Sequence, residues 1–173
     1  IAYIAGMLEK HGYECKLIDA NILKIHNEEV IKIIEKDNPD LVCISINVAT
    51  ALAGNSLGRE VKEKLNKRVI IGGVQASSVT ERTLKNSLAD AVILGESEET
   101  VLELVRKDCD PHGVSGLAYL EEDRVVYTGE RPLIENLDDL PWPAYHLLPP
   151  LKLYKSRSRR SPVAPIFTTR GCP

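Results

Sequence analysis

Three short runs of consecutive apolar residues most constrain what this sequence can fold into. They are LVCISI at 41–46, VIIGG at 69–73 and AVILG at 91–95. A strand that is apolar at successive positions is buried on both faces, which is typical of a parallel sheet covered by helices on both sides. Because parallel neighbours are joined by crossover connections, a helix is expected after each run.

The segments around these runs have apolar residues three and four positions apart, the spacing of amphipathic helices. Segment 13–20, YECKLIDA, alternates instead and predicts a strand. Repeated helices and strands with short connections predict an α/β domain with a doubly wound parallel sheet, Rossmann-like or flavodoxin-like. Such a sheet has a strand before its first helix, and we expect that strand upstream of Ile1. Helices are predicted at 1–11, 27–38, 52–66, 78–88 and 97–108.

The pattern changes after Cys109. The segment SGLAYLEEDRVVYTG at 115–129 alternates on both sides of a polar turn and predicts a β-hairpin. Seven of the ten prolines fall between residues 131 and 165, which predicts an extended linker or wrapping arm. The chain opens within a helical pattern and stops soon after a cysteine, so we expect a segment of a longer protein. The predicted parts are an α/β domain at 1–110, a hairpin extension at 111–130, a Pro-rich linker at 131–165 and the start of another domain at 166–173.

Composition argues against several classes of protein. The net charge is −3, so the chain lacks the overall basic excess of a nucleic-acid-binding protein. Its one basic cluster, KLYKSRSRR at 152–160, could contact phosphates, but a solvated linker surface is the favoured interpretation. The four cysteines are far apart, which favours a reducing compartment such as the cytoplasm over a disulfide framework. No stretch approaches the roughly 18 apolar residues of a membrane span.

Small and polar residues follow the three apolar runs, where parallel α/β sheets bind their ligands. Glycine lets a ligand approach the backbone, and hydroxyl and amide side chains offer hydrogen bonds. A loop before a helix, a tight turn and a helix cap would explain the same residues without a ligand, and the sequence leaves both interpretations open. The candidate binding residues are Ser45, Asn47 and Thr50 after the first run, Gly72, Gly73, Val74 and Gln75 at the second, and Gly95 and Glu96 at the third.

Several other kinds of site lack their motifs in this sequence. Neither G-x-G-x-x-G nor G-x-x-x-x-G-K-[ST] occurs, which argues against a dinucleotide fold or a P-loop. Residues Ser45-Ile46-Asn47 stand where a phosphoreceiver domain would need an aspartate. The four histidines are scattered, so no cluster indicates a hydrolase or a metal site.

The order of these segments resembles the cobalamin (B12)-binding radical SAM enzymes. The opening IAYIAGMLEKHGYECKLIDA is similar to the first helix and second strand of their cobalamin domain. The segments NPDLVCISI, VIIGGVQAS, ADAVILGESEETVLEL and LIENLDDLPWPAYHLLP resemble its successive landmarks. The final FTTRGCP resembles the entry to the radical SAM domain, and together these segments cover nearly the whole chain.

The resemblance implies a cobalamin site at the strand ends and a radical SAM domain in the same chain. Cys172 would be the first of three thiolates that hold a [4Fe-4S] cluster, whose free iron binds S-adenosylmethionine. A side chain at Gly72 or Gly73 would obstruct the nucleotide tail of cobalamin. The whole protein would be a methyltransferase or a radical cyclase, and this fragment would bind cobalamin without catalysing the reaction.

Two departures from the family leave alternatives open. Gln75-Ala76 follows the glycine pair where members often carry His-Pro. The motif D-x-H-x-x-G would follow the expected upstream strand, so no residue of this chain is assigned as the lower axial ligand of cobalt. The alternative is a degenerate domain that no longer binds cobalamin and serves as an interaction or scaffold domain of a radical SAM protein.

Overall fold

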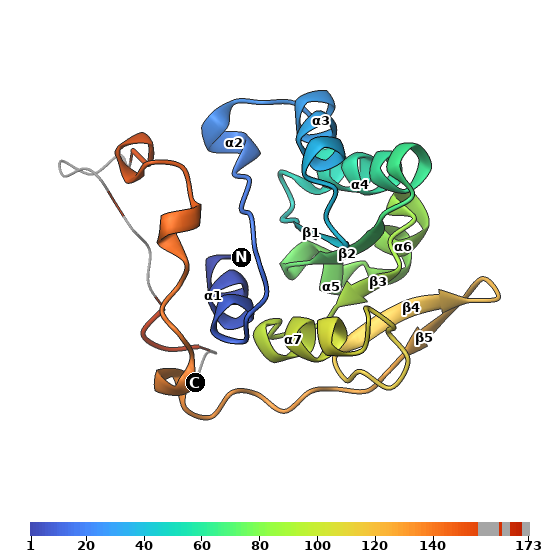
Figure 1. Cartoon of the computed structure of the whole chain (residues 1–173). Coiled ribbons are helices and arrows are strands. Elements are labelled where there is room, and N and C mark those ends of the chain that lie inside the picture. Colours follow the sequence, from blue (N-terminus) through green and yellow to red (C-terminus); the bar gives the residue numbers. More distant parts are fainter. Residues whose placement is uncertain (156–162, 164–166, 171–173) are drawn as a thin grey trace. The chain divides into compact units, whose positions relative to one another are not determined.

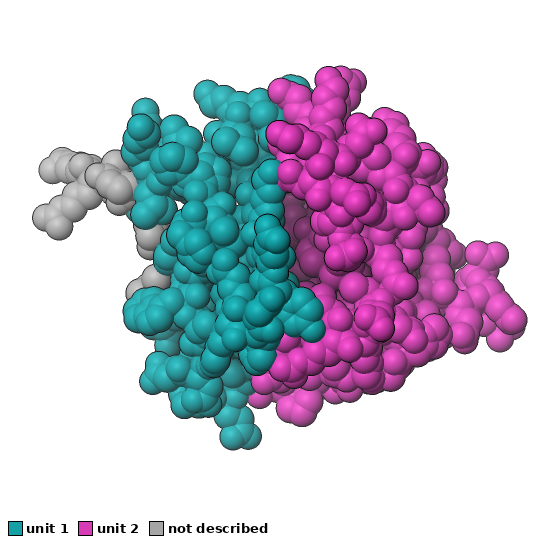
Figure 2. Space-filling model, viewed as in Figure 1, with its two compact units in different colours: residues 1–26, 134–173 teal, residues 27–133 magenta. Residues whose placement is uncertain are grey.

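The computed structural model describes residues 1–155, 163 and 167–170. The chain forms two compact units, shown in different colours in Figure 2. Unit 1 comprises residues 1–26 and 134–173, and unit 2 comprises residues 27–133. The predicted part boundaries, which divide the chain at 110, 130 and 165, remain predictions.

Unit 2 contains a five-stranded sheet in the order β1-β2-β3-β4-β5. The three apolar runs form the parallel strands β1 (Leu41–Ser45), β2 (Arg68–Gly72) and β3 (Ala91–Ile93). The antiparallel strands β4 (Leu117–Glu121) and β5 (Arg124–Tyr127) extend the sheet beyond β3 as the predicted hairpin. The predicted α/β sheet fold is confirmed, with the hairpin making the sheet mixed.

The helices of unit 2 are α3 (Asn27–Asp37), α4 (Ala51–Glu60), α5 (Val74–Ser78), α6 (Thr80–Ser87) and α7 (Glu98–Arg106), and α4 continues as a π-helical turn at Val61–Leu65. Arg59 of α4 holds the end of α6, because its Nε and Nη2 each donate at 3.0 Å to the carbonyls of Asn86 and Lys85. Figure 1 shows α7 on the side of the sheet away from α4 and α6.

The core of unit 2 lies between the central strands and these helices. Ala91, Val92 and Ile93 are all at most 3% exposed, as expected for a strand that is covered on both faces. The helices contribute the other half of the core through their apolar stripes. The largest fully buried side chains of the unit include Val61, Val69, Ile70, Ile71, Leu84, Val101, Leu104, Val114 and Leu117.

Unit 1 is built from two helices and the Pro-rich segment. Its elements are α1 (Ala2–Lys10), α2 (Ala20–Leu23) and three 3₁₀ turns at Leu137–Asp139, Tyr145–Leu147 and Leu151–Leu153. The backbone N–H of Ala144 donates to the Ala2 carbonyl at 2.9 Å, and the Nε2 of His146 lies 3.1 Å from a Glu9 carboxylate oxygen. The part of the Pro-rich segment around Ala144 and His146 therefore contacts α1.

The strand predicted at 13–20 does not form among the described residues. Its alternation survives in burial, since Tyr13, Cys15 and Leu17 are half-buried while Glu14 and Lys16 are exposed. A strand also needs a neighbour for its N–H and C=O groups, and no described strand pairs with this segment. The segment instead leads into α2, whose first turn is capped by Asp19.

Within the described part of the chain, no helix is both long enough and apolar enough to span a membrane.

Candidate functional site

The carboxyl ends of β1, β2 and β3 lie at one edge of the sheet in unit 2. Ser45 is the register partner of Gly72, and a Cβ built on Gly72 would lie 3.5 Å from the Cβ of Ile93. Paired residues of parallel strands point to the same face, so Ser45, Gly72 and Ile93 form a row across the three strands. The sequence-predicted residues of the first two strand ends are thus brought together.

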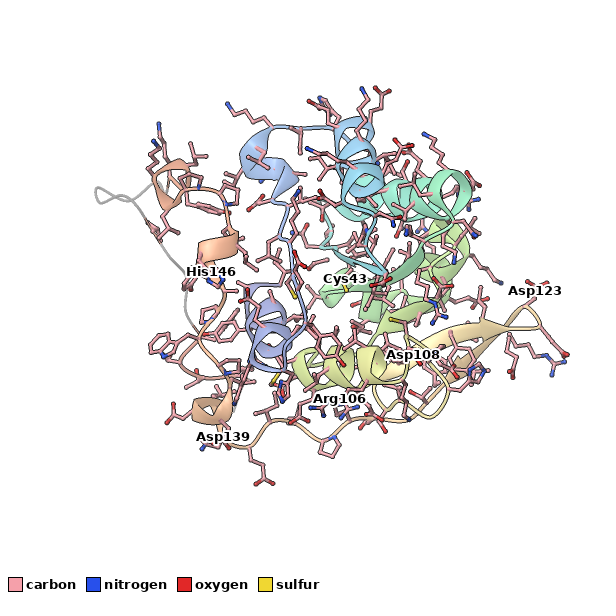
Figure 3. The ribbon with its side chains drawn as sticks, in the orientation of Figure 1. Cys43, Arg106, Asp108, Asp123, Asp139 and His146 are labelled. Atoms are coloured by element: carbon pink, nitrogen blue, oxygen red, sulfur yellow. The ribbon has the colours of Figure 1, made fainter. Side chains whose placement is uncertain are left out.

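The row faces away from α4. A Cβ on Gly54 of α4 would lie 3.5 Å from Ile44, and one on Gly58 would lie 3.3 Å from Ile71, so these two isoleucines point towards α4. Successive side chains of a strand alternate between faces, which places Ser45 and Gly72 on the opposite face. Cys43, labelled in Figure 3, shares that face and is exposed, as is Ser45. The face opposite α4 is therefore accessible along the edge strand β1.

The first loop, residues 46–50, is organised by two of the predicted site residues. The Oδ1 of Asn47 accepts hydrogen bonds from the backbone N–H groups of Ala49 at 2.9 Å and Thr50 at 3.1 Å. In return, the Thr50 hydroxyl accepts from the Asn47 N–H at 3.0 Å. Asn47 and Thr50 thus shape the turn that starts α4, and this interpretation holds whether or not they also touch a ligand.

The second loop begins at Gly73, whose φ of +102° is unfavourable for any residue with a side chain. A Cβ at this position would also collide with the Ile46 carbonyl of the first loop. Val74 follows as the first residue of α5 and is exposed, while Gln75 is half-buried. The two glycines therefore differ: Gly73 is required by the fold, whereas the surroundings of Gly72 accept a methyl group.

The third loop, residues 94–97, joins β3 to α7. Gly95 has a φ of +68°, and a Cβ built on it would meet no atom within 4 Å. The carbonyl of Glu96 lies 3.4 Å from the Thr100 hydroxyl, so this residue is tied to the first turn of α7. Gly95 is an open position at the edge, and the half-buried Glu96 is held by the helix that follows.

Three apolar side chains at this edge are exposed, and only one of them was singled out from the sequence. Val48 is 82% exposed, Leu52 87% and Val74 76%. They belong to the first loop, the first turn of α4 and the start of α5. We call them the apolar rim. Contiguous apolar patches on a surface mark interaction sites, whereas single exposed apolar residues are common. Val48 and Leu52 could have been noticed as apolar residues within an otherwise small and polar loop.

The sequence predicts one metal ligand, Cys172. In residues 1–155, 163 and 167–170, no group of three His, Cys, Asp or Glu side chains could hold a metal ion. Cys172, the predicted cluster ligand, lies outside the described residues.

Comparisons with known proteins agree with this geometry. The family model "B12 binding domain" matches residues 1–105. An uncharacterized methyltransferase from Pyrococcus horikoshii is 33% identical over all of this chain and 38% of its own length. The anaerobic magnesium-protoporphyrin IX monomethyl ester cyclase of Cereibacter sphaeroides is 28% identical over 81% of this chain and 24% of its own length.

A solved structure shows the shared fold. The cobalamin-dependent S-adenosylmethionine radical enzyme OxsB, with aqua-cobalamin and S-adenosylmethionine bound, superposes with a TM-score of 0.72 at 17% identity. The match covers 83% of this chain and 21% of OxsB. This chain thus spans less than half the length of each of these relatives.

The fold and its glycine-rich strand ends define an α/β domain of the class whose members bind ligands beyond the carboxyl ends of parallel strands. With the family match over residues 1–105, the chain belongs to the B12-binding domain family. Its fold is that of the cobalamin-dependent radical SAM enzymes, so the resemblance drawn from the sequence is confirmed.

Proposed function

We propose that this domain holds cobalamin at the carboxyl edge of β1, β2 and β3, and that the whole protein is a radical SAM enzyme of the methyltransferase or cyclase type. The observation that carries the site is the row of Ser45, Gly72 and Ile93, which combines an exposed hydroxyl with a position that has no side chain. The reaction types rest on the names of the Pyrococcus and Cereibacter relatives.

The residues present suit the chemistry of cobalamin. Its corrin ring is flat and largely apolar, which matches the apolar rim of Val48, Leu52 and Val74. Its nucleotide tail needs space beside the sheet, which Gly72 provides, with Ser45 as a hydrogen-bonding neighbour. Asn47, Thr50, Gly73, Gln75, Gly95 and Glu96 shape the three loops around this space. When bound, cobalamin would supply methyl-transfer or radical chemistry, and this domain would hold and orient it.

A titration of the full-length protein with hydroxocobalamin, followed by absorbance, tests the proposal. Leu52→Asp would place a charge on the apolar rim and should weaken binding at least tenfold. It should leave the fold intact, because an acidic residue is favourable in the first turn of a helix. The matched control is Leu88→Asp, which changes another exposed leucine, at the C-terminal end of α6 in the connection between β2 and β3.

The outcomes separate the proposal from its alternative. Tight binding by the wild-type and Leu88→Asp proteins, with weak binding by Leu52→Asp, supports a site at this edge. A folded wild-type protein that binds no cobalamin would instead identify an interaction or scaffold domain. Equal affinities of all three proteins would move the site away from the apolar rim.

We further propose that Cys172 is the first ligand of a [4Fe-4S] cluster that binds S-adenosylmethionine in the whole protein. The support is the TTRGCP motif and the family of the domain that precedes it. Cys172→Ala in the full-length protein should abolish S-adenosylmethionine cleavage and leave cobalamin affinity unchanged, because separate domains hold the two cofactors. Normal cleavage by this variant would show that Cys172 is not a cluster ligand.

Finally, we propose that the protein is cytoplasmic and does not bind nucleic acid. The four widely spaced cysteines and the net charge of −3 support these two statements. The basic cluster at 152–160 extends beyond the described residues, which resume only at 163 after Lys155. Salt-dependent binding of RNA at physiological ionic strength would contradict the second statement.

A further inference from the structure

Arg131 is the most densely bonded side chain at the start of the Pro-rich segment. Its side chain is only 16% exposed and lies against α7. Its Nη2 is paired with the carboxylate of Glu103, and its Nη1 lies 3.7 Å from a carboxylate oxygen of Glu99. Its Nε donates to the Thr100 hydroxyl at 2.9 Å. One guanidinium therefore contacts three residues in the first two turns of α7.

The Thr100 hydroxyl connects Arg131 to the third loop of the proposed cobalamin site. It lies 3.4 Å from the carbonyl of Glu96 and equally far from the carbonyl of Ser115. A hydroxyl has a single proton, so it can donate fully to only one of these two acceptors. Both carbonyls are within reach of this proton, and Arg131 Nη2 also donates to the Ser115 carbonyl at 3.3 Å, so the Thr100 hydroxyl links Arg131 to the Glu96 carbonyl in the arrangement in which it donates there.

The other end of the third loop, at Leu94, is also held by a hydrogen bond close to Thr100 and Arg131. The backbone N–H of Leu94 donates to the Gly116 carbonyl at 2.8 Å. Gly116 has a φ of +81°, and a Cβ there would lie 2.9 Å from the Thr100 Oγ1 and 3.3 Å from the Arg131 Cβ. Only glycine allows the chain before β4 to approach this closely. The third loop is thus held at its Leu94 end by Gly116 and at its Glu96 end by Thr100. Arg131 lies beside both Gly116 and Thr100.

We infer that Arg131 is a positioning residue of the cobalamin site, which it reaches through the hydrogen-bond chain from its Nε to the Thr100 hydroxyl and on to the Glu96 carbonyl. This inference rests on the proposed function, since it concerns the third loop of the same site. Arg131 touches no ligand itself. It sets the conformation in which Gly95 and Glu96 face the edge of the sheet.

The test uses Arg131→Gln, Thr100→Val and the double variant in the full-length protein. Two quantities are measured well below the melting temperature: the Kd for hydroxocobalamin, and the hydrogen-exchange rates of the amides of residues 95–97 without ligand. Each single variant should weaken cobalamin binding about fivefold, the change expected for one hydrogen bond, and should speed the exchange. The double variant should bind no more weakly than Thr100→Val, because both residues act through one chain of bonds.

Two matched variants separate positioning from general stability. Arg131→Lys keeps a positive charge beside Glu99 and Glu103, but a lysine cannot reach Thr100 and Ser115 together. Compared with Arg131→Gln, it should therefore restore the melting temperature more than it restores the affinity for cobalamin. Arg124→Gln on the exposed edge of β5 should change neither quantity.

Two outcomes would overturn the inference. One is an Arg131→Gln protein that melts at a lower temperature but keeps wild-type affinity and wild-type exchange rates. The other is a double variant whose loss of affinity is the sum of the two single losses. A wild-type protein that binds no cobalamin would contradict the proposed function, and the exchange rates alone would then decide whether Arg131 orders the loop.

Discussion

The adjacent glycines Gly72 and Gly73 show how differently two identical residues can serve one site. At Gly73 the backbone has a φ of +102°, and an added Cβ would overlap the Ile46 carbonyl. At Gly72 no positive φ is present, and an added Cβ would make an ordinary contact with Ile93 at 3.5 Å. The sequence-based expectation that both glycines leave room for a ligand stays a prediction, and the structure adds that the turn itself requires Gly73.

Gly72→Ala should weaken cobalamin binding about tenfold, by about 1.4 kcal/mol, with little loss of stability. The added methyl fits the free protein but occupies space that the nucleotide tail would need. Gly73→Ala should lower the free energy of unfolding by 1 kcal/mol or more, because of its backbone strain and steric overlap, roughly as expected for such positions. Binding titrations and urea unfolding of both variants measure the two effects. A Gly72→Ala protein with wild-type affinity would place the tail elsewhere.

A second prediction at this scale concerns pH and Glu103. The hydrogen bond from Arg131 lowers the pKa of the Glu103 carboxyl, helped by Lys107. A carboxyl whose pKa is lower in the folded state stabilises the fold above its unfolded pKa, and this contribution disappears as the pH falls through the folded pKa. Glu103→Gln should therefore cost about 1 kcal/mol at pH 7 and less at about pH 3.

Urea unfolding of the wild type and Glu103→Gln at the two pH values measures this difference. The matched control is Glu81→Gln, which removes an exposed i,i+4 pair with Lys85 and should change stability little at either pH. A Glu103→Gln protein whose loss is the same at both pH values would contradict a role for the ionised carboxylate.

At the scale of elements, the sequence predicted what periodicity and turn chemistry determine. The continuous apolar runs became β1, β2 and β3, and the predicted helix at 52–66 is α4 with its π-helical turn. The short helix α5 was not predicted, because five residues are too few to show a period. The segment 13–20 was wrongly predicted as a strand, since alternation indicates which side chains are buried but not whether a partner strand is present.

The candidate site likewise has residues that could be proposed from the sequence and residues that could not. Glycines and polar residues at strand ends could be named from the sequence, because parallel strands end at a common edge. The exposure of Val48 and Leu52 could not be predicted from the sequence, because an apolar residue in a loop can be buried or exposed, depending on its neighbours in space. The role of Arg131 was also hidden, since it joins residues 16 to 32 positions away in the sequence.

The start of α4 carries a prediction that belongs to the element. Asn47 holds the turn through its side-chain oxygen, which accepts from two backbone N–H groups. Asn47→Ala should cost about 1 kcal/mol of unfolding free energy, the typical net worth of a side-chain hydrogen bond. Asn47→Asp keeps the acceptor and should be nearly neutral. Unfolding curves of the two variants decide this, and an alanine variant as stable as the wild type would show that the turn does not depend on this side chain.

At the scale of the whole molecule, residues 134–155 of the Pro-rich segment contact the N-terminal elements of unit 1. Along with the contacts of Ala144 and His146 to α1, the Tyr154 hydroxyl donates to the Asp19 carboxylate at 2.9 Å. The other oxygen of Asp19 accepts from the Ile22 N–H at 3.0 Å at the start of α2. Ile22 and Tyr154 thus bind the same carboxylate, although they lie more than 130 positions apart in the sequence. This carboxylate connects the part of the Pro-rich segment near Tyr154 to the N-terminal residues.

The bond between Tyr154 and Asp19 gives a prediction at high pH. Burial, together with the hydrogen bond to the Asp19 carboxylate, raises the pKa of Tyr154 to about 12. The contribution of this tyrosine to stability is therefore fully present below its ordinary pKa of 10, and is lost as the pH rises from 10 through about 12. Tyr154→Phe should lower the free energy of unfolding by about 1 kcal/mol at pH 8, the typical worth of such a hydrogen bond.

The loss on replacing Tyr154 should shrink as the pH is raised above 10, because ionisation then stabilises the unfolded wild type while the folded protein keeps this tyrosine protonated up to about pH 12. Urea unfolding at pH 8 and about pH 11 measures this, with a tyrosinate absorbance titration to follow the pKa directly. Tyr127→Phe is the matched control, since Tyr127 is 59% exposed on β5 and its replacement should leave stability unchanged at both pH values. A wild-type protein in which every tyrosine titrates near pH 10 would show that Tyr154 does not fasten the arm.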